Sequence, residues 1–139
     1  MRISFALAAA LSLSACRPSG KVEAASLDDA VDRYRRAEGV QKVSESEAVA
    51  GLPCTSPEVC DAKKACLGAM NATTRALGLK DEVARTVGDL QEKRLPLDAS
   101  AVQDLPGKLD EATQLLQEGR TKMADCEKQL VDLRLRFGQ

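Results

Sequence analysis

Apolar and small residues recur in alternating steps of three and four along the second half of the chain. This spacing is the period of helices packed side by side in a coiled coil, so it predicts long helices over about 57–94 and 100–137. The first stripe has one charged member, Lys80, and consists of Val59, Ala62, Cys66, Ala69, Thr73, Ala76, Lys80, Val83, Val87 and Leu90. The second stripe consists of Val102, Leu105, Leu109, Ala112, Leu116, Gly119, Met123, Cys126, Leu130, Leu133 and Phe137. An all-α fold is therefore expected.

Pro96 lies between the two stripes, and proline breaks the hydrogen-bond ladder of a helix, so we expect the chain to reverse there. Folding the chain back at this point brings the stripes into one register. That register places Cys66 opposite Cys126. It also pairs Val59 with Leu133, Ala62 with Leu130, Ala69 with Met123, Val83 with Leu109 and Leu90 with Val102. The pattern predicts an antiparallel helical hairpin locked by a bridge between Cys66 and Cys126.

A shorter apolar stripe precedes the long helices and predicts a helix over about 27–38; it consists of Leu27, Val31 and Tyr34. Ser26 suits the N-cap of this helix, and Gly39 suits its end. Residues 40–55 lose the regular pattern, so we expect a loop there with at most a weak helical turn near residues 45–49.

Further apolar residues lie beside the seam of the hairpin and need cover: Leu67, Met70, Leu77, Leu79, Leu115 and Val131. The short N-terminal helix is the expected cover, which would complete a small helical bundle. The alternative is that this surface binds a partner or a second copy of the chain as a homodimer.

The first sixteen residues follow a different pattern. Arg2 precedes an apolar run over residues 3–13, and the small residues Ser14 and Ala15 stand before Cys16. A basic start, an apolar stretch and small residues before a cleavage point are the parts of a secretory signal peptide. The run is shorter than the roughly 20 apolar residues that span a bilayer.

The four residues Leu13-Ser14-Ala15-Cys16 resemble the lipobox of bacterial lipoproteins. This resemblance implies that residues 1–15 are a signal peptide and that Cys16 becomes the first mature residue. Cys16 would carry a thioether-linked diacylglycerol and an N-acyl chain such as palmitate. Two or three acyl chains hold a domain at a membrane almost permanently. The alternative is an ordinary signal peptide with a chance cysteine.

Arg17 follows Cys16 where an acidic residue would favour retention at the inner membrane, so the signal resembles an outer-membrane address. The side of that membrane, periplasmic or cell-surface, stays open. Residues 16–25 contain Pro18, Ser19 and Gly20 without apolar periodicity, and we expect a lipidated flexible tether there. The small helical domain is expected over 26–139.

Four cysteines follow the expected lipidation site: Cys54, Cys60, Cys66 and Cys126. An exported chain with an even number of cysteines favours disulfides. Cys60 and Cys66 cannot pair within one helix, because six residues separate them by about 9 Å along its axis. We favour Cys54–Cys60 with Cys66–Cys126, since the crossed alternative requires Cys60, which lies off the stripe, to reach Cys126.

Zinc is the competing use of these cysteines. The chain has no histidine, and the gaps between its cysteines do not match the close pairs of zinc sites, so no metal ligand is assigned. Catalysis is not expected either, because the sequence lacks a histidine base and a glycine-rich phosphate loop. We therefore predict a non-enzymatic protein with no catalytic residue and no cofactor.

Charge excludes one class of partner. The chain has 20 basic and 21 acidic residues, interspersed along its length, and a net charge of −1. Nucleic-acid binding depends on clustered basic residues, so nucleic acid is not an expected partner.

The export signal and the hairpin together favour a structural or protein-interaction module at the membrane surface of the cell envelope. The membrane, through the N-terminal lipid, and an envelope protein are the expected partners. One alternative is an inhibitor or immunity lipoprotein directed against a lytic enzyme or a toxin. Another is a pilotin-like escort of a secretin subunit, which the chain resembles in architecture only.

Overall fold

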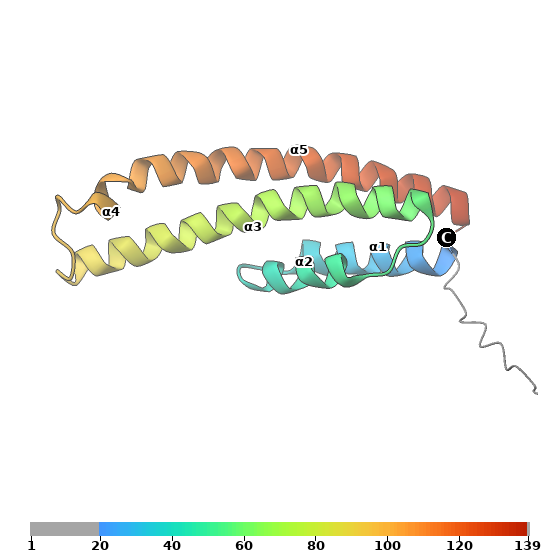
Figure 1. Cartoon of the computed structure of the whole chain (residues 1–139), viewed down its shortest axis with the longest axis horizontal. Coiled ribbons are helices and arrows are strands. Elements are labelled where there is room, and N and C mark those ends of the chain that lie inside the picture. Colours follow the sequence, from blue (N-terminus) through green and yellow to red (C-terminus); the bar gives the residue numbers. More distant parts are fainter. Residues whose placement is uncertain (1–19, 139) are drawn as a thin grey trace, which may run out of the picture.

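The computed structural model describes residues 20–138, which form five helices and no strand. They are α1 (Gly20–Arg36), α2 (Gln41–Gly51), α3 (Pro57–Gln91), α4 (Ser100–Gln103) and α5 (Leu105–Phe137). The two long helices, α3 and α5, run antiparallel beside each other, and α1 and α2 form a short layer along one half of this hairpin (Figure 1). The all-α hairpin with an additional N-terminal helix is confirmed.

The register of the hairpin is the one that the two stripes predict. Cys66 and Cys126 are bonded across the seam, with their Cα atoms 4.6 Å apart. Two turns away, Gly119 lies directly against the Thr73 side chain. Farther along the helices, the Lys108 ammonium donates to the Glu82 carboxylate at 2.7 Å. Opposed positions therefore stay in step along the described hairpin.

The core is concentrated in the half of the hairpin that α1 and α2 cover. One cluster joins buried residues of α1, α2, α3 and α5: Ala24, Leu27, Ala30, Val31, Tyr34, Val49, Val59, Ala62, Cys66, Met70, Cys126, Leu130 and Leu133. A smaller seam cluster follows, formed by Ala72, Ala76, Ala112 and Leu115. No residue between 77 and 111 is buried. We call this outer part of the hairpin, residues 77–111, the arm.

The first helix begins at Gly20, earlier than the sequence predicts. Ser26 is an exposed residue within the helix and not its N-cap, and the buried stripe extends back to Ala24. The expected tether over residues 16–25 is therefore wrong from Gly20 onward. The hydrogen bonds from Thr55 and Ser56 to Glu23, together with the burial of Ala24, explain the difference, because a sequence pattern does not reveal these contacts. Residues 16–19 lie outside the described part of the chain.

Residues 41–51, expected as a loop with a weak helical turn, form the complete helix α2. Its apolar face is narrow: Val49 is fully buried, and Ser46 is its other buried residue. Contacts from neighbouring helices hold it in place. Lys63 of α3 donates to the carbonyls of Ala50 and Leu52 at the end of α2. Tertiary contacts thus produce a helix where local periodicity is weak.

The turn between the long helices contains Pro96, as expected. Helix α3 ends at Gln91, three residues before the predicted end, and Lys93 adopts a left-handed backbone with φ of 58°. The last long helix is interrupted at Asp104, which separates the single turn α4 from α5.

Candidate interaction surface

Three helix ends meet at one end of the bundle, which we call the base: the first turns of α1 and α3 and the last turn of α5 (Figure 1). Gly20 marks the contact, since a Cβ atom there would lie 2.9 Å from the Phe137 ring and 2.5 Å from the Ser56 hydroxyl. The second disulfide, Cys54–Cys60, fastens the loop before α3 to the first turn of that helix. The base is therefore a fixed assembly.

A buried carboxylate joins α1 to the start of α3. Glu23 is 3% exposed and accepts three hydrogen bonds, from the Thr55 hydroxyl at 2.6 Å, the Thr55 N–H at 2.9 Å and the Ser56 N–H at 3.2 Å. The bonds from Thr55 and then Ser56 hold the pKa of the Glu23 carboxyl below its ordinary value, against the opposing effect of desolvation. Ser56 makes no side-chain cap of its own, so Glu23 supplies negative charge at this helix start.

Ion pairs fix the other side of α1 against α5. The Arg134 guanidinium binds both oxygens of Asp28, with Nε donating at 2.9 Å. This contact raises the pKa of Arg134, with the Asp28 hydrogen bond as its main cause. Farther from the base, Arg35 pairs with Glu127 at 2.8 Å. Helix α1 is thereby joined to both long helices by polar contacts as well as by its apolar stripe.

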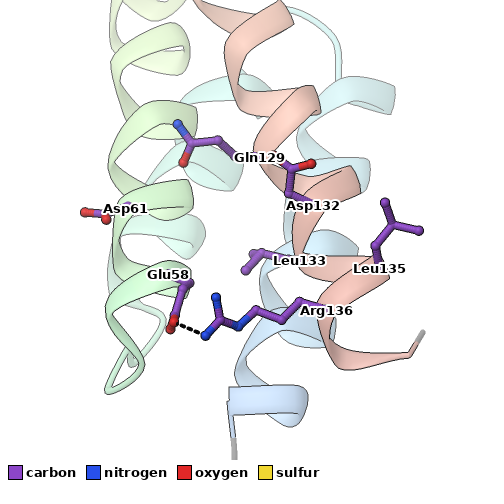
Figure 2. A pocket seen from close by; sticks show the side chains of 7 residues that line it. All are labelled: Glu58, Asp61, Gln129, Asp132, Leu133, Leu135 and Arg136. Atoms are coloured by element: carbon purple, nitrogen blue, oxygen red, sulfur yellow. Dashed lines mark ion pairs between the residues drawn. The ribbon is translucent and has the colours of Figure 1, made fainter.

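A groove lies between the start of α3 and the end of α5, and Figure 2 shows it with α1 and α2 behind it. It has a volume of about 570 Å³ and is lined by Glu58, Asp61, Gln129, Asp132, Leu133, Leu135 and Arg136. The Arg136 guanidinium reaches across it to the Glu58 carboxylate at 2.6 Å. Leu135 points away from α3 at its rim, and its residue is 78% exposed.

The groove continues along the same two helices into a second depression that shares Asp61, Gln129 and Asp132 with it. The other lining residues of this depression are Lys64, Ala65, Gly68, Lys122, Asp125 and Lys128. Acidic and basic side chains alternate along its length, and small residues form part of its α3 wall. Such a surface favours a polar protein contact over a small apolar ligand. Across residues 20–138, no cluster of three His, Cys, Asp or Glu side chains could hold a metal ion.

The arm presents a different surface. Leu97, in the connection beyond Lys93, is 76% exposed, and Leu109 on α5 is 46% exposed. Lys108 and Glu82 bridge the two helices there, but α1 and α2 stop short of the arm (Figure 1). Helices α1 and α2 therefore leave the arm uncovered.

The structure places the predicted disulfide residues as expected: Cys66 and Cys126 are buried on the seam, whereas Cys54 and Cys60 are partly exposed at the base. The expected lipidation site Cys16 lies outside the described residues. The sequence reasoning overlooked Glu23, because it assigned residues 16–25 to a tether. The signal that could have revealed it is Ala24, which continues the apolar stripe back by three residues.

None of the described helices is long and apolar enough to cross a membrane. Comparison with protein-family models, with curated proteins and with solved structures found no match to this chain.

Proposed function

We propose that the chain is a non-enzymatic lipoprotein of the bacterial cell envelope, anchored in the outer membrane through acylated Cys16, whose arm is a contact site for another envelope protein. The observation that carries the proposal is the absence of any buried residue between positions 77 and 111. A segment of this length that adds no buried side chain contributes little to a core. It adds surface instead, as a recognition element does.

Length supports the same interpretation. Helix α3 has 35 residues, and at 1.5 Å per residue it spans about 50 Å. Gly20, four residues after the expected anchor, is at one end of the hairpin, and the arm is at the other (Figure 1). An anchor at the base would let the arm extend toward partners well away from the membrane. The seam disulfide and the Glu82–Lys108 ion pair keep the two helices together.

The test uses the acylated full chain in its native envelope, with a photo-crosslinking amino acid at Leu97. Val40 is the matched control, because it is 74% exposed against 76% for Leu97 but lies between α1 and α2. We expect a discrete protein adduct from position 97 and none from position 40. Equal labelling from both positions, or none from position 97, would contradict the proposed contact site.

The anchor is tested separately by intact mass of the membrane-purified chain beside a Cys16→Ser form. The expected result is the added mass of two or three acyl chains that the Cys16→Ser form lacks. A water-soluble product cut elsewhere would contradict the anchor. The identity of the adduct from position 97 distinguishes a scaffold partner from a lytic enzyme, a toxin or a secretin subunit.

A further inference from the structure

The position of the expected anchor relative to the base limits how the molecule can sit on a membrane. Cys16 precedes Gly20 by four residues, and an extended chain reaches about 3.5 Å per residue, so the lipid lies within about 14 Å of the first residue of α1. Gly20 itself is packed against Phe137 and Ser56. An acyl anchor on Cys16 would therefore keep the whole base, and not α1 alone, close to the lipid surface.

Exposed apolar side chains are present at this end. Leu135, in the last turn of α5, is 78% exposed, which makes it the most exposed large hydrophobic residue between positions 20 and 138. Val131, one turn earlier, is 47% exposed, and Val22 in the first turn of α1 is 54% exposed. Helix packing covers none of the three well, although the core cluster lies within a turn of each.

Several charged residues at the base already have partners within the protein. In the last turn of α5, Arg134 pairs with Asp28 and Arg136 pairs with Glu58. Glu23, the buried acid of the first turn of α1, is satisfied by the backbone of Thr55 and Ser56. Because these acids already have partners within the protein, they keep those partners when the base enters the headgroup region beside lipid phosphates.

We propose that the base is seated end-on in the headgroup region of the anchoring membrane, with Leu135 and Val22 entering the boundary between headgroups and acyl chains. The inference rests on the proposed acylation of Cys16. The occupant is lipid, because the anchor holds these side chains within reach of a bilayer and apolar side chains partition into that boundary. End-on seating directs the arm away from the membrane.

The test reconstitutes the acylated full chain into vesicles of phosphatidylethanolamine and phosphatidylglycerol that contain lipids with a doxyl quencher. An environment-sensitive fluorophore is placed on a single new cysteine in Leu135→Cys or Val22→Cys. Matched controls are Leu97→Cys, 76% exposed on the arm, and Val43→Cys, 44% exposed on α2. Intact mass confirms one label and two disulfides, and circular dichroism confirms the helical fold, for every variant.

We expect a blue shift and loss of fluorescence for the probes at positions 135 and 22, and unchanged fluorescence at positions 97 and 43. If the acylated chain floats with the vesicles while the probe at 135 stays in water, the seating is overturned and the anchor stands. Equal quenching at 97 or 43 indicates a molecule lying flat and also overturns it. A probe at 135 that shifts only when envelope protein is added identifies a protein contact instead. A chain without acyl groups overturns both proposals.

Discussion

Glu23 shows how one side chain, placed by a neighbouring helix, decides a local structure. Its carboxylate accepts hydrogen bonds from the Thr55 hydroxyl and from the N–H groups of Thr55 and Ser56, and these bonds lower its pKa. A depressed pKa contributes stability that is present above the unfolded-state value and is lost as pH falls through the folded-state value. We therefore expect Glu23→Gln to lower the urea midpoint at pH 7, and the difference from wild type to shrink toward pH 3. The matched control is Glu47→Gln on the exposed face of α2. A constant difference across this pH range would show that the charge of Glu23 has no role.

Gly119 tests how closely the two long helices pack at one point of the seam. A Cβ there would overlap the Thr73 hydroxyl and lie 3.3 Å from the Ala69 carbonyl oxygen. Gly119→Ala should lower the free energy of unfolding by about 1–3 kcal/mol, despite the better helix propensity of alanine. At Gly78, in the middle of α3, an added Cβ would meet no atom within 4 Å. Gly78→Ala should therefore raise the free energy of unfolding by up to about 1 kcal/mol. Urea unfolding compares the two, and a double Thr73→Ala, Gly119→Ala variant should recover stability. The same sign for both glycine variants would rule out a close seam.

At the scale of helices, the two disulfides have unequal roles. The seam bridge closes 60 residues of sequence and joins α3 to α5, whereas the Cys54–Cys60 bridge closes six. By loop-closure entropy, we expect replacing Cys66 and Cys126 by alanine to cost about 4 kcal/mol and replacing Cys54 and Cys60 about 2 kcal/mol. Urea titrations followed by circular dichroism measure both losses. Equal losses would mean that strain or residual structure, and not loop length, sets the contribution.

The long helices were predictable because two independent signals agree on their register. The heptad stripes place Thr73 opposite Gly119, and the same alignment brings Cys66 to Cys126. The base was not predictable in this way. The early start of α1 depends on the contact between Glu23 and the loop before α3. Helix α2 depends on the burial of Val49 against neighbouring helices. It also depends on Lys63 of α3, which donates hydrogen bonds to the carbonyls at the end of α2.

The same limit applies to the candidate surfaces. The cysteine pairs follow from spacing and helix geometry, so the sequence reveals them. The predicted register places Val59 opposite Leu133 and so brings the two walls of the groove together. The ion pair between Glu58 and Arg136 across the groove depends on side-chain conformations, which periodicity does not state. Leu97 gives no sequence signal of exposure, because an apolar residue beside a proline can equally be part of a core.

Across the whole molecule, stability is distributed along the hairpin axis. The main cluster, with both disulfides nearby, occupies the half of the hairpin beside the base. The small cluster around Ala76 and Ala112 contains the last buried residues before the arm. The arm has only half-buried seam residues beyond that point. Opening free energies within one protein follow local burial. A partner that binds the arm would therefore meet the least protected part of the chain, and a membrane at the base would meet the most rigid part.

Hydrogen exchange measures this gradient directly. We expect the amides of residues 77–111 to open at a lower free energy than those of residues 59–70 and 123–133, which flank the seam disulfide. The Cys66→Ala, Cys126→Ala variant should raise exchange on both sides of the missing bridge. The wild-type chain with an envelope partner should gain protection in the arm, whereas vesicles alone should protect the last turn of α5. Uniform protection along α3 would mean that the hairpin opens as a single unit. The same core would then stabilise the arm and the base.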